Sequence, residues 1–125
     1  MVYNMDALDF LRMLPNNVFV YLDPPYYVKG KSLYMNHYKE NDHQQLANYL
    51  LNDAEFFWLL SYDDTPQIRE KYQTLELYRF PLNYTVSTKR TGYELLTHSP
   101  NLLFLENLHI KRNTHGKNIL IERIL

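Results

Sequence analysis

An acidic residue, two prolines and an aromatic residue follow one another at Asp23-Pro24-Pro25-Tyr26. The prolines make this turn rigid, so it fixes a carboxylate, a free backbone carbonyl and an aromatic ring relative to one another. An ionised carboxylate only accepts hydrogen bonds, and those bonds are charge-assisted. The alternative interpretation is a plain strand-ending turn, because Asp and Pro are ordinary turn residues. The four residues are therefore candidates for a site that accepts hydrogen bonds beside an aromatic face.

The segment before this motif indicates where the motif lies in the fold. Residues 18–22 form a continuous apolar run rich in β-formers, which is typical of a strand buried on both faces of a parallel sheet. Ligands in open α/β sheets bind beyond the carboxyl ends of the strands. The motif therefore has the right position for a functional site.

The remaining pattern alternates helices and strands. Asp42 with Gln45 forms a capping-box pattern, and Thr65 with Pro66 forms a cap followed by a first-turn proline. Helices are predicted over residues 6–14, 42–52 and 65–72. Strands are predicted over residues 18–22, 56–61, 75–80, 84–87 and 94–97, with a tail hairpin from 108–111 and 118–124. Residues 26–41 are expected to form a long loop. The fold class is α/β, with a parallel start and a β-rich end.

The composition excludes several classes of protein. The chain has 125 residues, 46% of them hydrophobic, which is enough for one domain with a real core. It contains no cysteine, so disulfide scaffolds and thiolate chemistry are excluded. The net charge of −1 means that any nucleic-acid contact must come from local clusters. With no signal peptide or membrane span in the sequence, a cytoplasmic protein is expected.

With this motif behind a buried strand, the sequence resembles the amino-methyltransferases, and more narrowly the adenine-specific DNA methyltransferases of the Dam/D12 class. Three further stretches match in order, and the resemblance spans roughly residues 2–97. They are residues 4–10, 40–46 and 88–96. The resemblance implies the second half of a Rossmann-like methyltransferase sheet with its helices, over residues 1–101. Residues 102–125 are expected to form a separate extension that contains the hairpin.

The resemblance implies transfer of a methyl group from S-adenosylmethionine to the exocyclic amine of an adenine swung out of double-stranded DNA. Asp23 and the carbonyl of Pro24 would accept the two amine hydrogens, and Tyr26 would stack on the base. Asp6 and Asp23 would lie at the cofactor, although Asp6 is equally well placed as a helix N-cap.

Basic and aromatic residues after the motif and in a later loop are expected to contact the nucleic acid. They are Tyr27, Lys29, Lys31, Tyr38, Lys89 and Arg90. The alternative for the lysines after the motif is an ordinary solvated loop. The histidines have no ligand spacing, so neither a metal site nor a hydrolytic triad is expected.

The glycine-rich turn that holds the cofactor in this fold has no counterpart, because the glycines are isolated at 30, 92 and 116. The strand at residues 18–22 would then present an unpaired edge, which predicts a homodimer or a complementing chain. Two other functions remain open. One is a fragment of an RNA guanine-N2 methyltransferase, and the other is a non-catalytic remnant that self-associates.

Overall fold

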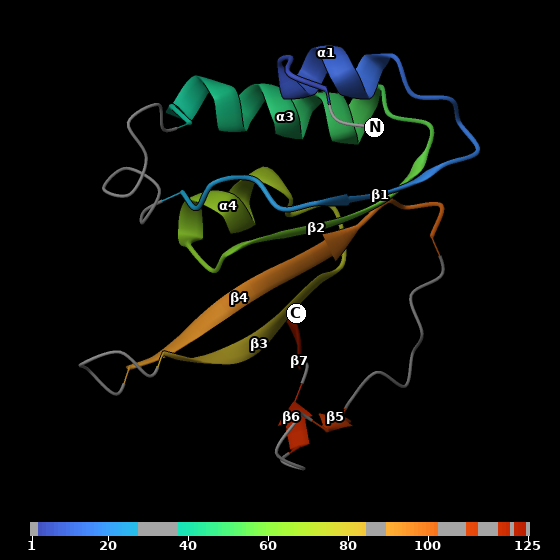
Figure 1. The fold of residues 1–125 in the computed structure, drawn as a ribbon. Helices are drawn as coiled ribbons and strands as arrows, with labels where there is room; N and C mark the ends of the chain where they lie inside the picture. The colour runs from blue at the N-terminus through green and yellow to red at the C-terminus, as the bar shows by residue number, and fades with distance from the viewer. Residues whose placement is uncertain are drawn as a thin grey trace.

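The computed structural model describes residues 3–27, 38–84, 90–102, 110–112, 118–120 and 122–124. They form a mixed α/β fold, as the sequence predicts (Figure 1). The helices are α1 (Ala7–Arg12), α3 (Glu40–Asn52) and α4 (Pro66–Lys71). The main strands are β1 (Phe19–Leu22), β2 (Phe57–Asp63), β3 (Leu77–Tyr84) and β4 (Arg90–His98). Three short strands follow, β5 (Ile110–Arg112), β6 (Asn118–Leu120) and β7 (Glu122–Ile124).

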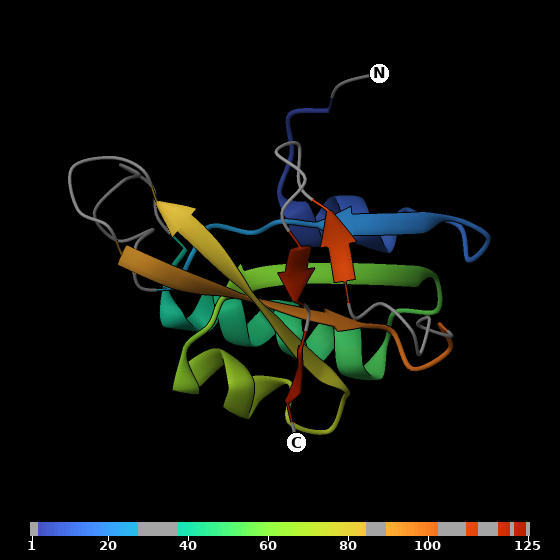
Figure 2. The ribbon, with the colours of Figure 1, turned by 90° about the horizontal axis from the view of Figure 1, so that it is seen from below.

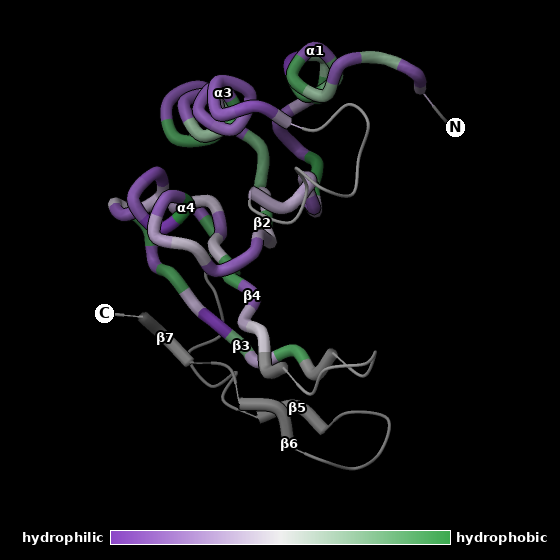
Figure 3. The backbone as a smooth tube through the Cα atoms, turned by 90° about the vertical axis from the view of Figure 1, so that its left-hand side faces the viewer, coloured by the Kyte–Doolittle hydropathy of each residue, from purple (hydrophilic) through white to green (hydrophobic). Residues whose placement is uncertain are grey.

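The helices cover one face of a five-stranded sheet whose strand order is β1-β2-β4-β3-β7 (Figures 1 and 3). The core lies between these two layers. Trp58, Leu60 and Tyr62 alternate along β2, are at most 1% exposed, and face the helices. Leu46 and Leu50 meet them from α3 and are also buried. Alternation in the strand and a helical spacing of four in α3 therefore build one shared apolar layer.

Strand β1 lies at the edge of the sheet and runs parallel to β2, with Tyr21 opposite Leu59. The predicted parallel start is thus confirmed. The prediction that this strand is buried on both faces is wrong, because Phe19 is 56% exposed and Tyr21 is 57% exposed. Val20 and Leu22 pack against the core, whereas the opposite face of β1 carries no helix among the described residues. An apolar run alone cannot distinguish these two environments.

Local signals at the helix starts are confirmed in two of three places. The Asp6 side chain accepts hydrogen bonds from the backbone N–H groups of Leu8 and Asp9, at 3.0 and 3.3 Å. Thr65 caps α4 by accepting from the Ile68 N–H at 3.2 Å. The predicted cap at Asp42 is wrong.

Helix α3 begins at Glu40, two residues earlier than predicted. Asp42 is its third residue, and its carboxylate accepts from the backbone N–H of Lys39 at 2.8 Å. The acidic residue therefore acts as the inner partner of a capping box, where the sequence interpretation made it the cap itself. Both positions favour an acidic residue, since each brings a carboxylate to the unpaired N–H groups of the first turn.

The β-rich end differs from the prediction in its strand bounds. Strand β3 runs unbroken through residues assigned in the sequence to two strands, and it pairs antiparallel with β4 from Leu77 to Tyr84. Residues 85–87 of the predicted second strand lie outside the described residues, as does most of the predicted loop at 26–41. In the tail, β5 pairs with β6 as the predicted hairpin requires, on the side of the sheet away from the helices (Figures 1 and 2). The prediction of one strand over residues 118–124 is wrong, because β6 and β7 share that range and belong to different sheets.

Strand β7 joins the main sheet by pairing antiparallel with β3.

No helix among the described residues has the length and apolar character needed to cross a membrane.

Candidate active site

The motif residues begin directly after β1, at the edge where the parallel strands β1 and β2 both end. Asp23 is exposed, and its Oδ1 accepts a hydrogen bond from the Ser61 hydroxyl at 3.2 Å. Ser61 is fully buried near the end of β2 and lies 2.9 Å from the hydroxyl of Tyr21. The carboxylate of Asp23 is therefore open to solvent but held from below by the neighbouring strand.

Tyr26 is hydrogen-bonded to a residue of β4. Its hydroxyl donates to Oε2 of Glu94 at 3.1 Å. Glu94 lies on β4, paired in register with Asp63 of β2. Burial raises the pKa of Glu94, and the negative charges of Asp23 and Asp63 raise it further, while hydrogen bonds from Tyr26 and Ser61 oppose the rise. Three carboxyl groups thus lie close enough to influence one another at this edge of the sheet.

Tyr27 turns toward α3. Its backbone N–H donates to Oδ1 of Asp63 at 2.7 Å, and its hydroxyl donates to Oε2 of Glu40. The Tyr27 and His43 rings are 5.2 Å apart, and Tyr38 approaches the same imidazole edge-on, also at 5.2 Å. The structure therefore places Tyr27 and Tyr38 together against the first turns of α3.

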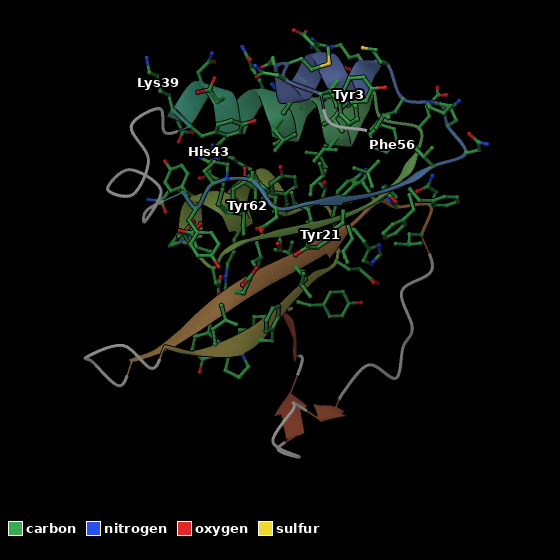
Figure 4. The ribbon with its side chains drawn as sticks, in the orientation of Figure 1. Tyr3, Tyr21, Lys39, His43, Phe56 and Tyr62 are labelled. Atoms are coloured by element: carbon green, nitrogen blue, oxygen red, sulfur yellow. The ribbon has the colours of Figure 1, made fainter. Side chains whose placement is uncertain are left out.

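A buried polar pair lies beneath these rings. Nδ1 of His43, which is 1% exposed, lies 2.8 Å from the Tyr62 hydroxyl (Figure 4). Burial lowers the pKa of His43, and the negative charges of Glu40 and Asp63 offset part of that effect. At the surface, Glu40 also accepts from Lys71 of α4. The ion pair with Lys71 and the hydrogen bond from Tyr27 lower the pKa of Glu40. These contacts fix the start of α3 beside the motif.

Asp6 lies in the helix layer. Its carboxylate caps α1, and its charge contributes to raising the pKa of the half-buried Tyr38, after the larger effect of burial. Asp6 also lines an open groove of about 490 Å³ between α1 and α3. Other polar residues of that groove are Asp9, Arg12, Gln45, Asn48 and Asp53. Asp23 is not among the residues that line this groove.

The basic residues expected at nucleic acid are only partly described. Arg90 begins β4, where its backbone pairs with Tyr84. Lys29, Lys31 and Lys89 lie outside the described residues. Within the described part of the chain, no group of three or more His, Cys, Asp or Glu side chains is arranged to hold a metal ion.

Three side chains of the site were not identified from the sequence. Ser61, Asp63 and Glu94 contact the motif from β2 and β4, at sequence separations of 36 to 68 residues. The available signal was the polar Ser-x-Asp at the end of an otherwise apolar strand, since polar residues at buried strand ends need partners. The register that brings Glu94 opposite Asp63 could not be predicted without the strand pairing.

A family model described as D12 class N6 adenine-specific DNA methyltransferase matches residues 1–86. The match includes α1, the motif, α3, β2, α4 and β3, and ends before Glu94. No protein with curated function matches the chain.

Proposed function

Since the chain belongs to the family of D12 class N6 adenine-specific DNA methyltransferases, we propose that Asp23, Pro24 and Tyr26 form its adenine site. Methylation of adenine N6 in DNA is the activity of this family. The observation that carries the proposal is the position of the motif. An exposed carboxylate, held by Ser61, follows an edge strand at the carboxyl ends of two parallel strands.

The proposed role of Asp23 follows from the chemistry of the amine. The lone pair of the exocyclic nitrogen is delocalised into the adenine ring, so the amine is a poor nucleophile. Asp23 and the carbonyl of Pro24 accept its two hydrogens, which draws the nitrogen toward tetrahedral geometry and exposes its lone pair. The site then contributes mainly positioning and electrostatic stabilisation.

Tyr26 is proposed to stack on the base. Taking adenine out of the duplex costs a few kcal/mol, and stacking on an aromatic ring returns roughly 1–3 kcal/mol per base. The hydrogen bond to Glu94 fixes the position of the hydroxyl end of the ring. Tyr27 and Tyr38 lie beside each other across His43, and we assign them to the same DNA-facing region. Lys29, Lys31, Lys89 and Arg90 are proposed to contact phosphates.

The cofactor proposed for this chain is S-adenosylmethionine, which supplies a methyl group carried on a cationic sulfonium. The residues at the reacting end fit such a group, because Asp23, Asp63 and Glu94 place carboxyl groups at one edge of the sheet. An excess of negative charge there favours a cation. Asp6 is proposed to contact the adenosine part, at the groove between α1 and α3.

The cofactor role of Asp6 can be separated from its role as a helix cap. We expect Asp6→Asn to leave the free energy of unfolding within a few tenths of a kcal/mol, because Asn and Asp cap helices about equally well. Asp6→Ala should lose about 1 kcal/mol. Both variants should weaken the binding of S-adenosylmethionine several-fold, measured by calorimetry on the purified chain alongside thermal unfolding.

Thr65→Ala is the matched control, since it removes the cap of α4 but lies outside the groove. It should lose comparable stability with unchanged cofactor binding. If Asp6→Asn binds S-adenosylmethionine as tightly as the parent chain, Asp6 is a cap alone. If the parent chain takes up no cofactor at millimolar concentration and methylates no DNA, the proposed function is wrong for this chain by itself.

A second chain is proposed to pair with the β1 edge, either a copy of this chain or a complementing one. Among the described residues β1 has a strand neighbour on one side, and Phe19 and Tyr21 are more than half exposed. Such edges recruit partners. We expect a dimer by light scattering at micromolar concentration, with slow amide exchange in β1.

Phe19→Lys should shift that equilibrium toward monomer, because a charge on an edge strand opposes pairing. Met13→Lys is the control, since Met13 is 64% exposed but follows α1 and lies outside β1. A parent chain that is monomeric, with rapidly exchanging β1 amides, would rule out the homodimer.

A further inference from the structure

We propose that Ser61 and Glu94 are positioning residues, which set the geometry of the adenine site by holding the Asp23 carboxylate and the Tyr26 ring. This inference rests on the proposed function. It means that side chains of β2 and β4 determine how the motif residues are oriented. Neither residue belongs to the motif. Each is separated from the motif residue it contacts by 38 or 68 positions in the chain.

Ser61 determines which part of the carboxylate is available. The Ser61 hydroxyl donates to Oδ1 of Asp23, and the Tyr21 hydroxyl lies 2.9 Å from the same Ser61 oxygen. With Oδ1 engaged from below, Oδ2 is the oxygen left to accept from an incoming amine. Ser61 is 0% exposed within a paired strand, so its hydroxyl is a fixed reference for an otherwise solvent-exposed side chain.

Glu94 restrains the aromatic ring of Tyr26 as Ser61 restrains the carboxylate of Asp23. The phenolic oxygen of tyrosine lies on the axis of the second side-chain bond, so a hydrogen bond at the hydroxyl fixes the direction in which the ring points, while the ring plane can still turn about that axis. Tyr26 donates from that position to Glu94, which is half-buried on β4. Ser61 and Glu94 lie on neighbouring strands, since Asp63, two residues after Ser61, is paired with Glu94. The Asp23 carboxylate and the Tyr26 ring are thus both held by hydrogen bonds to the paired strands β2 and β4.

A third tether supports this interpretation. The backbone N–H of Tyr27 donates to Asp63, which lies two residues after Ser61 and is paired with Glu94. The turn from Asp23 to Tyr27 has no regular strand or helix hydrogen bonds to hold it. The end of β2 and the middle of β4 therefore contact the motif at Asp23 and at Tyr26, and the end of β2 also contacts the following residue, Tyr27.

The test compares two serines in the same kind of environment. Ser61 and Ser99 are both at most 2% exposed and both hydrogen-bonded, but Ser99 contacts the backbone of Trp58 at the far end of β2. We expect Ser61→Ala to lower kcat for methyl transfer to adenine-containing DNA about 10- to 100-fold. KM for S-adenosylmethionine and for DNA should stay within about two-fold, because positioning affects the reacting geometry. Ser99→Ala should keep the parent kcat.

Glu94 is tested by a conservative pair of variants. Glu94→Gln keeps an oxygen that can accept from Tyr26, so it should retain most of the parent kcat. Glu94→Ala removes the acceptor and should lower kcat about ten-fold, the cost of one lost hydrogen bond. Because Gln also keeps the packing of Glu, Tyr26→Phe tests the hydrogen bond itself: it removes the donor but keeps the ring, and it should also lower kcat about ten-fold. A site that depended only on packing would keep the parent kcat in Tyr26→Phe.

A titration of Glu94 by NMR, on the chain without substrate, provides a readout independent of activity. The hydrogen bond from Tyr26 lowers the pKa of Glu94. Tyr26→Phe should therefore raise that pKa, whereas Ser99→Ala should leave it unchanged.

The outcomes separate the two proposals. If Asp23→Asn abolishes methyl transfer while Ser61→Ala and Glu94→Ala keep the parent kcat, the positioning role is overturned and the proposed function stands. If the parent chain transfers no methyl group, the proposed function fails and the NMR measurements decide alone. An unchanged Glu94 pKa in Tyr26→Phe then overturns the positioning role of Glu94, and an unchanged NMR chemical shift of the Asp23 carboxyl carbon in Ser61→Ala overturns that of Ser61.

Discussion

Asp23→Asn is expected to lower kcat for methyl transfer to DNA adenine by about 10²- to 10³-fold, the scale seen when one transition-state hydrogen-bonding group is removed. Asparagine keeps the shape of the side chain but replaces one acceptor oxygen with an N–H₂ donor and loses the negative charge. With Oδ1 engaged by Ser61, the position facing the amine can no longer be a charged acceptor. The fold should be unaffected, because Asp23 is exposed.

The measurement is incorporation of tritiated methyl groups from S-adenosylmethionine into DNA that lacks N6-methyladenine. Glu55→Gln is the matched control, since it also neutralises one exposed carboxylate but lies before β2, at the other end of the strand. The control should transfer methyl groups at the parent rate. Equal incorporation by Asp23→Asn and by the parent chain would show that the motif is a structural turn, which was the alternative interpretation of its sequence.

Trp58→Ala is expected to lower the free energy of unfolding by about 3–5 kcal/mol, the range for truncating a buried large aromatic residue. Trp58 is 0% exposed near the start of β2, which lies between β1, the strand that leads to the motif, and β4, the strand that carries Glu94. Typical domains are stable by only about 5–15 kcal/mol. The variant should therefore be largely unfolded near physiological temperature.

Chemical unfolding followed by far-ultraviolet circular dichroism measures this change without relying on the lost fluorophore. Trp58→Phe should cost much less, because the buried indole N–H has no hydrogen-bond partner in the described part of the chain. Phe57→Ala, at the adjacent position and 39% exposed, is the surface control and should also cost little. A Trp58→Ala variant as stable as Phe57→Ala would mean that β2 is not the centre of the core.

The parts of this fold that depend on short stretches of sequence could be predicted. The Thr65 cap, the parallel start and the position of the motif behind β1 each follow from neighbouring residues. The burial of β1 could not, because a run of apolar residues reads alike whether one or both faces are covered. The single long strand β3 was missed because Pro81 and Asn83 interrupt its β-forming pattern.

For the site, the sequence identified the residues of the motif but not those that support it. Asp23 and Tyr26 are three residues apart in a rare local pattern, whereas Ser61 and Glu94 become neighbours only through the pairing of β2 with β4. Antiparallel register depends on contacts between distant segments, which no local pattern encodes. The positions proposed for DNA contact at Lys29, Lys31 and Lys89 remain predictions from the sequence.

The edge position of β1 joins two equilibria that would otherwise be independent. Asp23 is the residue directly after the last residue of this strand, so a chain that pairs with β1 also restrains the backbone on which the carboxylate sits. If pairing with β1 increases the affinity for the ligand by some factor, then binding of the ligand must increase the affinity for the pairing chain by that same factor. We therefore expect the affinity of this chain for its pairing partner and its affinity for the ligand to increase together. A measured dissociation constant for the ligand then depends on the concentration of the partner, and one for the partner depends on the concentration of the ligand.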